Sequence, residues 1–230
     1  MKTIGLIGGM SWQSTLEYYR IINETTNERL RGSQSARCIL YSFNFAEVGI
    51  LQADGKWDEL TKLIIKAAQR LESADAEFIV ICTNTIHKLA DDVQKNVNIP
   101  ILHIVDAVAD KIGEKGFSKV GLLGTKFTME EDFYKKRLKE KYDIEVIIPD
   151  KEERETIHNI IYNELCLGLI KPSSKEKFLE IIKNLNTNGA EGVILGCTEI
   201  PLLVKEKDID IPLFDTTTIH AKAAVEFALR

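Results

Sequence analysis

The 230-residue sequence has little of what marks disulfide-bonded or membrane-spanning proteins. Its four cysteines are widely spaced and form no CxxC motif, so we expect reduced thiols and a cytoplasmic protein. No stretch approaches the roughly 20 apolar residues that cross a bilayer. The short apolar run after Met1 is interrupted by Gly8 and Gly9, and it lacks the long hydrophobic region of a signal peptide.

The sequence also lacks the signature of a nucleic-acid-binding protein. Lysine and arginine number 30 against 35 acidic residues, and the formal net charge is −5. No basic run contains interleaved aromatic residues, and the basic residues 135–137 lie beside acidic residues 130–132, as on a solvated helix face. We therefore expect neither nucleic acid nor a membrane as a partner.

Motifs for metals and nucleotides are missing as well. None of the four histidines has the spacing of a zinc ligand, so we expect no metal. Residues 5–9 do not form a GxGxxG motif and lack an acidic residue about 20 positions later at a strand end. Residues 124–126 do not form a P-loop.

What the sequence does contain is a regular alternation of strand-length apolar runs with segments of helical periodicity. The predicted strands are Thr3–Ile7, Arg37–Phe43, Phe78–Cys82, Ile101–Ile104, Lys119–Leu123, Glu145–Ile148, Gly192–Leu195 and Leu213–Phe214. The predicted helices include Ser14–Arg31, Asp58–Ser73, Met129–Lys141, Lys151–Leu167, Ser174–Asn186 and Ile219–Leu229. This alternation predicts an α/β fold with mostly parallel sheets.

An internal repeat predicts two similar lobes. Residues 76–85, AEFIVICTNT, recur as residues 190–199, AEGVILGCTE, and the two starting positions give an offset of 114. Further matches align Gly8 with Gly124 and Ile99-Pro100 with Ile211-Pro212. We expect a first lobe of residues 1–100 and 213–230 and a second lobe of residues 101–212, with the C-terminal helix packed on the first lobe.

Four polar turns follow predicted strands, at residues 8–11, 83–85, 124–125 and 197–199. Ligands of parallel α/β sheets bind beyond the carboxyl ends of the strands. Backbone N–H groups and helix N-termini there favour a small anion such as a carboxylate. The alternative is that the serine, threonine and asparagine side chains only cap helices. The symmetry-related placement of all four turns favours a site in the cleft between the lobes.

Cys197 is the leading catalytic candidate. A cysteine at a strand-to-helix turn can have a lowered pKa, and its thiolate is a competent base or nucleophile. The alternative, a buried structural cysteine, suits Cys38 and Cys166 better. Thr83 occupies the equivalent position in the first repeat, but its hydroxyl is a very weak base. Cys82 is adjacent, and alternation along the strand points it into the core.

Two further residues have open interpretations. His87 lies four residues after Thr83 on the first turn of the following helix, where it either orients the site or caps the helix. Gln52 lies in a predicted polar loop with residues 54–56, as part of a lid or as a surface glutamine.

These motifs resemble the aspartate/glutamate racemase family. Its pattern is Cys-Asn-Thr-x-His in the first half and Gly-Cys-Thr-Glu in the second. The present chain has Thr83-Asn84-Thr85-Ile86-His87 and Gly196-Cys197-Thr198-Glu199, and it opens with Gly5-Leu-Ile-Gly-Gly-Met10-Ser11-Trp12. The resemblance covers essentially the whole length.

The resemblance implies two flavodoxin-like lobes and a cofactor-independent enzyme, commonly a homodimer, that inverts the α-carbon of an acidic amino acid. One group removes the Cα proton and another delivers a proton to the opposite face. Cys197 and Thr83 occupy the two catalytic positions. The positions that match substrate-binding residues are Met10, Gln52, Asn84, Thr85, Thr125 and Thr198, and Glu164 resembles a supporting residue of the site.

Thr83 departs from the two-thiol pattern and is similar to a subgroup that prefers the L-enantiomers of aspartate and glutamate. We expect Cys197 to deprotonate the L-substrate and reprotonation from the Thr83 side to be slow or water-assisted. Two alternatives stay open at this point: a related single-cysteine isomerase or decarboxylase of dicarboxylates, and a non-catalytic sensor of amino acids or dicarboxylates. A pyridoxal enzyme is disfavoured, because Lys126 is the only lysine at the four turns.

Overall fold

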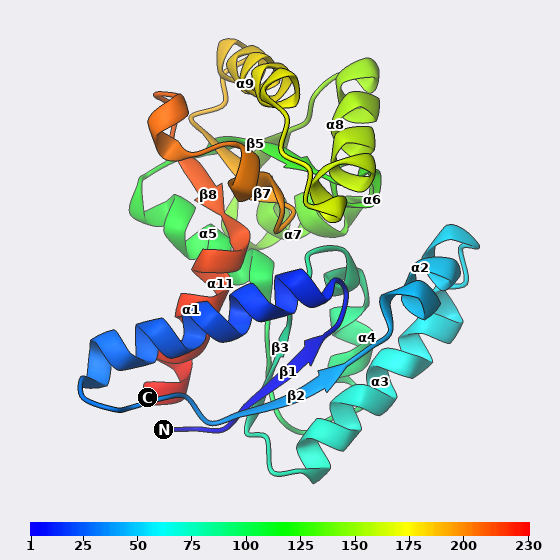
Figure 1. Cartoon of the computed structure of the whole chain (residues 1–230), viewed down its shortest axis with the longest axis vertical. Helices are drawn as coiled ribbons and strands as arrows, with labels where there is room; N and C mark the ends of the chain where they lie inside the picture. Colours follow the sequence, from blue (N-terminus) through cyan, green and yellow to red (C-terminus); the bar gives the residue numbers. More distant parts are fainter. The chain divides into compact units, whose positions relative to one another are not determined.

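The computed structural model describes all 230 residues and divides into two compact units. The first unit comprises Met1–Ile104 and His220–Arg230, and the second comprises Val105–Ile219. Each unit contains one four-stranded sheet in which every strand pair is parallel (Figure 1), which confirms the predicted α/β class. No helix combines the length and apolar character needed to cross a lipid bilayer.

The first sheet has the strand order β2-β1-β3-β4. Its strands are β1 (Ile4–Gly8), β2 (Cys38–Ser42), β3 (Phe78–Ile81) and β4 (Ile101–Leu102). The helical segments of this unit are α1 (Trp12–Leu30), α2 (Phe45–Ala53), α3 (Trp57–Ser73), the 3-10 helix η1 (Thr85–Leu89), α4 (Ala90–Gln94) and most of α11 (Thr216–Leu229).

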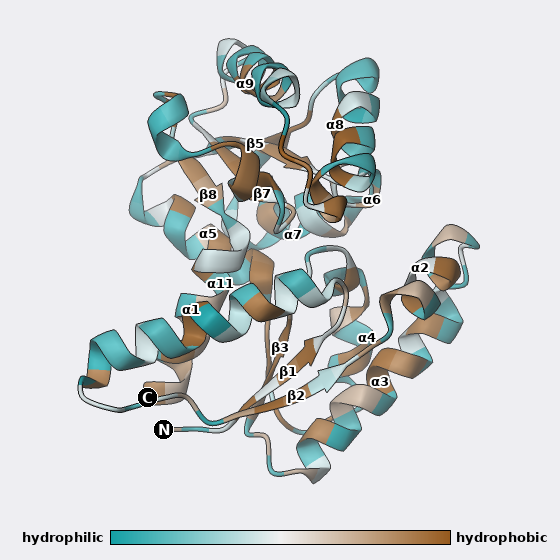
Figure 2. Ribbon diagram, viewed as in Figure 1, coloured by the Kyte–Doolittle hydropathy of each residue, from teal (hydrophilic) through white to brown (hydrophobic).

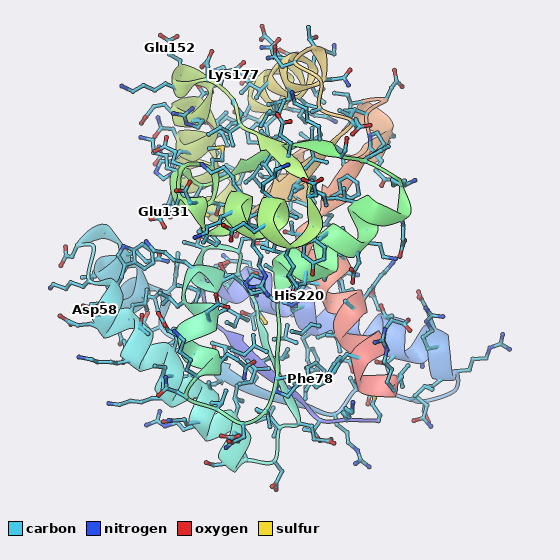
Figure 3. All side chains as sticks on the ribbon, turned by 180° about the vertical axis from the view of Figure 1, so that it is seen from behind. Asp58, Phe78, Glu131, Glu152, Lys177 and His220 are labelled. Atoms are coloured by element: carbon cyan, nitrogen blue, oxygen red, sulfur yellow. The ribbon has the colours of Figure 1, made fainter.

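Both faces of the first sheet are buried under helices, as the continuous apolar runs of its strands require. On one face, Leu6 and Val80 pack with residues of α1 and α11, including Tyr18 and Val225. On the other face, the strands pack against α3 and α4. Most of the C-terminal helix therefore packs on the first unit. Figure 3 shows Phe78 inside this unit and Asp58 pointing outward from α3.

The second sheet has the strand order β6-β5-β7-β8. Its strands are β5 (Lys119–Gly124), β6 (Glu145–Ile147), β7 (Gly192–Gly196) and β8 (Leu213–Asp215). The helical segments are α5 (Ile104–Glu114), α6 (Lys126–Glu130), α7 (Asp132–Tyr142), α8 (Lys151–Asn163), η2 (Leu165–Leu167), α9 (Pro172–Thr187), α10 (Ile200–Leu203) and η3 (Glu206–Asp208).

One face of the second sheet packs under α8 and α9. Leu123, Val193 and Leu195 share a core with Ile157 of α8 and Phe178 of α9. Figure 2 shows hydrophobic residues along the strands and hydrophilic ones along the outer side of α9. The charged residues of α8 and α9 therefore face solvent, and the core determines how both helices sit on their sheet.

Every predicted strand is present, with ends that differ by no more than two residues, but three helical predictions need correction. The predicted helix Met129–Lys141 is two helices, because Glu131 has an extended backbone (ψ 154°) and separates α6 from α7. The predicted helix Lys151–Leu167 ends at Asn163. The predicted loop around Gln52 is the end of α2, a helix that begins with Asn44 accepting a hydrogen bond from the Ala46 N–H.

Candidate functional site

The ends of β5 and β7 bring two of the predicted site residues together. Gly124 and Gly196 pair in register, so Thr125 and Cys197 follow at the same edge of the second sheet. A side chain at Gly196 would place its Cβ 2.8 Å from the carbonyl oxygen of Leu123, which makes glycine necessary there. The Thr125 hydroxyl is buried and lies 3.3 Å from that of Thr128.

The turn after β7 joins a thiol to a carboxylate. The Cys197 thiol donates a hydrogen bond to Glu199 Oε2 at 2.8 Å, and the Thr198 hydroxyl donates to the same oxygen at 2.8 Å. Glu199 is buried, with an exposed fraction of 7%. Motif matching alone gives Glu199 no role, but a carboxylate two residues after a cysteine in a strand-end turn is the signal that points to it.

The expectation of a lowered pKa at Cys197 is wrong. Burial raises the pKa of the Cys197 thiol well above its usual value, and the Glu199 carboxylate raises this pKa further. The backbone N–H of Glu199 acts in the opposite direction but more weakly. The helix that follows, α10, has only four residues and so contributes little dipole. The resting state of Cys197 is therefore the thiol.

Two neighbours of Cys197 are also uncharged near neutral pH. Burial raises the pKa of Tyr162 to about 12, and interactions with Cys197 and Cys166 add to this effect. Burial likewise raises the pKa of Cys166 to about 12. The negative charge beside Cys197 therefore belongs to Glu199.

Glu164 is not part of a regular helix, because α8 ends one residue before it. Its carboxylate accepts a hydrogen bond from the Ser174 hydroxyl at 2.6 Å and forms an ion pair with Lys171 Nζ at 3.2 Å. The hydrogen bond from Ser174 lowers the pKa of Glu164, which keeps this carboxylate ionised. Its position is thus fixed by the beginning of α9.

In the first unit, the His87 side chain holds the turn that contains Thr83 through hydrogen bonds to backbone groups. His87 Nδ1 lies 2.7 Å from the Thr83 carbonyl oxygen, and His87 Nε2 accepts a hydrogen bond from the Ile104 N–H at 3.1 Å. A carbonyl only accepts, so Nδ1 carries the proton and the imidazole is neutral. His87 therefore orients the turn that contains Thr83.

Cys82 is buried in the core between β3, α1 and α11, as strand alternation predicts. Burial raises the pKa of its thiol far above the usual value. Its carbonyl oxygen accepts a hydrogen bond from the Ser14 hydroxyl at 2.8 Å. Cys82 is therefore a structural residue, and Thr83 is the residue that stands at the strand end.

The remaining candidates of the first unit occupy different places. Met10 follows β1 and its side chain belongs to the core under α3, whereas Asn84 and Thr85 follow β3, the strand next to β1. Ser11, in the same turn as Met10, caps α1 by accepting a hydrogen bond from the Ser14 N–H. Gln52 lies in the last turn of α2.

A cluster of buried histidines supports the Thr83 turn. The ring of His87 lies 4.7 Å from that of His103 and 5.5 Å from that of His220. His220 Nε2 donates to the Leu102 carbonyl at 2.8 Å, which leaves Nδ1 to accept from the Tyr18 hydroxyl at 2.9 Å. Burial lowers the pKa of His220 to about 4, so this imidazole is neutral (Figure 3 labels it on α11).

The His220 environment predicts a loss of stability in acid. Its pKa falls from 6.5 in the unfolded chain to about 4 in the folded one, so unfolding takes up a proton between these two pH values. The contribution of His220 to the unfolding free energy is then fully present above the unfolded pKa of 6.5 and is lost as the pH drops toward about 4. We expect the wild type to lose about 3 kcal/mol more unfolding free energy over this range than His220→Gln, in urea denaturation. Equal losses in the two proteins would contradict the assignment.

Comparison with known proteins gives consistent matches. The profile of the Asp/Glu/Hydantoin racemase family matches residues 7–224. The broad specificity amino-acid racemase RacX of Bacillus subtilis (strain 168) is 28% identical over 171 residues, which are 73% of this chain and 72% of that protein.

Two crystal structures cover this chain and their own chains completely. A protein from Yersinia pestis that bears the provisional name Asp/Glu racemase is 52% identical, with a TM-score of 0.95. An aspartate racemase homologue from Pyrococcus horikoshii OT3 is 44% identical, with a TM-score of 0.88. The two-unit fold described above is therefore similar to theirs throughout.

Proposed function

The chain belongs to the Asp/Glu/hydantoin racemase family, and on that premise we propose a cofactor-independent cytoplasmic racemase of aspartate or glutamate that favours the L-enantiomer. Cys197 is the base that removes the Cα proton. The observation that carries this proposal is the 2.8 Å hydrogen bond between the Cys197 thiol and the Glu199 carboxylate at the end of β7. The four free cysteines suit a reducing compartment.

The proposed reaction requires a base that accepts the Cα proton and groups that stabilise the negative charge left on the substrate. The Cα–H of an amino acid is very weakly acidic, so proton removal needs a positioned base and a stabilised carbanion. Thr125 and Thr198 lie at the edge of the sheet where Cys197 stands. The Thr125 hydroxyl suits a substrate carboxylate, whereas the Thr198 hydroxyl donates to Glu199. Glu164, as an ionised carboxylate, suits the substrate ammonium group.

In the first unit, Asn84 and Thr85 follow β3 and Met10 follows β1. Together with Gln52 of α2 they are the substrate contacts that we propose for this unit. In the repeat, Thr83 corresponds to Cys197 and Thr85 to Glu199, both at the offset of 114. The first unit thus has hydroxyls where the second has a thiol and a carboxylate. A hydroxyl is far too weak an acid or base to take over these roles directly.

His87 does not supply the missing proton donor, since both of its ring nitrogens are engaged by backbone groups. Reprotonation from the Thr83 side then relies on water. The enzyme we propose has one competent base, Cys197, and treats the two enantiomers unequally.

Isotope exchange tests this proposal. In D₂O, we expect the wild type to exchange the Cα proton of L-aspartate or L-glutamate at least about tenfold faster than that of the D-enantiomer. Cys197→Ser should lower exchange by about 10²–10⁴-fold, the usual contribution of a general base, and Thr83→Ala by much less. Nuclear magnetic resonance measures the exchange in all three proteins as the loss of the Cα proton signal of the amino acid.

Four outcomes would contradict parts of the proposal. Equal exchange of both enantiomers by the wild type would exclude the single-base mechanism. Full activity of Cys197→Ser with loss of activity in Thr83→Ala would invert the two roles. Binding of an amino acid without any exchange would indicate a sensor, and exchange only with substrates that lack an α-amino group would indicate a related isomerase.

We also propose that the enzyme is a homodimer formed through α1. Trp12, Leu16 and Tyr19 have the helical spacing i, i+4, i+7 and are 64%, 54% and 52% exposed. A contiguous exposed apolar stripe of this kind marks an interaction surface. The stripe begins directly after Ser11, so contact there would brace the turn that carries Met10.

The double variant Leu16→Glu/Tyr19→Glu should be monomeric, because two charges cannot be buried unpaired in an apolar interface. Light scattering after size-exclusion chromatography should give the mass of two chains for the wild type and of one for the variant. Ile50→Glu on α2 changes an equally exposed residue and serves as the matched control. A monomeric wild type, or a dimeric double variant, would exclude this interface.

A further inference from the structure

We propose that Glu199 acts through Cys197 as the acceptor of the thiol proton, so that the base of the reaction is the thiol–carboxylate pair and not the cysteine alone. This inference rests on the racemase function proposed above. It follows from the arrangement of three consecutive residues at the end of β7. The thiol and the Thr198 hydroxyl both donate to Glu199 Oε2, each at 2.8 Å.

The Thr198 hydroxyl fixes the carboxylate in a useful orientation. Since the two donors share one oxygen, the hydrogen bond from Thr198 holds Oε2 toward the sulfur. Glu199 is buried, so bulk water competes poorly for this oxygen. A carboxylate held this close to a thiol is placed to take its proton.

The proton transfer is balanced in charge. At rest the pair carries one proton, on sulfur, and one negative charge, on Glu199. Breaking the S–H bond and forming an O–H bond at Oε2 leaves a thiolate beside a carboxylic acid, with the same total charge. The thiolate then takes the Cα proton, and the electron pair of the Cα–H bond stays on the substrate. Water protonates the opposite face of the carbon, and the pair returns its extra proton to the hydroxide.

The groups around the pair support this role. Tyr162 of α8 and Cys166 of η2 interact with Cys197, and each has a pKa raised to about 12 by burial. Neither is a proton acceptor near neutral pH. The α10 helix is too short to stabilise a thiolate through its dipole. Glu199 is therefore the group that can receive the thiol proton without solvent.

The pH dependence of exchange tests the pair directly. Because the pair keeps one proton across neutral pH, the rate of L-aspartate exchange by the wild type (kcat/KM) should be nearly flat between about pH 6 and pH 8. Glu199→Gln must lose the thiol proton to solvent, so its rate should be lower and should rise about tenfold per pH unit. Thr198→Val keeps the carboxylate and should keep the flat profile at a reduced rate.

Glu199→Asp should restore part of the flat profile, because it retains a carboxylate. Equal slopes for the wild type and Glu199→Gln would assign Glu199 a structural role only. A wild-type rate that itself rises tenfold per pH unit would also overturn the pair.

A second readout needs no substrate. Alkylation of Cys197 by iodoacetamide, followed by peptide mass spectrometry, should reach its midpoint at a lower pH in Glu199→Gln than in the wild type, since the adjacent negative charge is gone. An unchanged midpoint would overturn the pair while leaving the racemase proposal intact. A shifted midpoint in a protein that exchanges no amino acid would overturn the racemase proposal, and with it the inferred reaction step, while leaving the thiol–carboxylate contact.

Discussion

The parallel pairing of β5 with β7 holds Thr125 and Cys197 at one edge of the second sheet, and the chemistry of that unit depends on it. The pairing continues to Gly124 and Gly196, and a side chain at Gly196 would place its Cβ too close to the Leu123 carbonyl oxygen. The core under α8 and α9 fixes the strands from one face. The turn that follows Gly196 can therefore point a thiol and a carboxylate at each other with little freedom to rearrange.

The two halves of the internal repeat share a backbone plan, but matching side chains make different contacts. The aspartate after β4, Asp106, forms a bidentate ion pair with Arg137 and a further one with Lys141, which ties α5 to α7. Its counterpart Asp215 instead caps α11 through the Thr217 and Thr218 N–H groups. The same divergence separates the Thr83 turn, which presents hydroxyls, from the Cys197 turn, which presents a thiol and a carboxylate.

Strand positions and the repeat were predictable because buried parallel strands have continuous apolar runs, and because Gly8 and Gly124 mark equivalent turns. The helix breaks at Glu131 and Asn163 were not, since local backbone conformation there follows tertiary contacts and not periodicity. The protonated state of the Cys197 thiol could not be predicted from the sequence either. A cysteine in a strand-to-helix turn is expected to have a lowered pKa, but burial and the Glu199 carboxylate raise the pKa of the Cys197 thiol.

The enzyme we propose favours one enantiomer because the symmetry between Thr83 and Cys197 is broken. The most direct measurement is the ratio of L- to D-aspartate Cα exchange in Thr83→Cys, compared with the same ratio in the wild type. A thiol in the first turn should raise D-aspartate exchange and bring the ratio toward one, with L-aspartate exchange retained. An unchanged ratio in a folded Thr83→Cys protein would contradict the account.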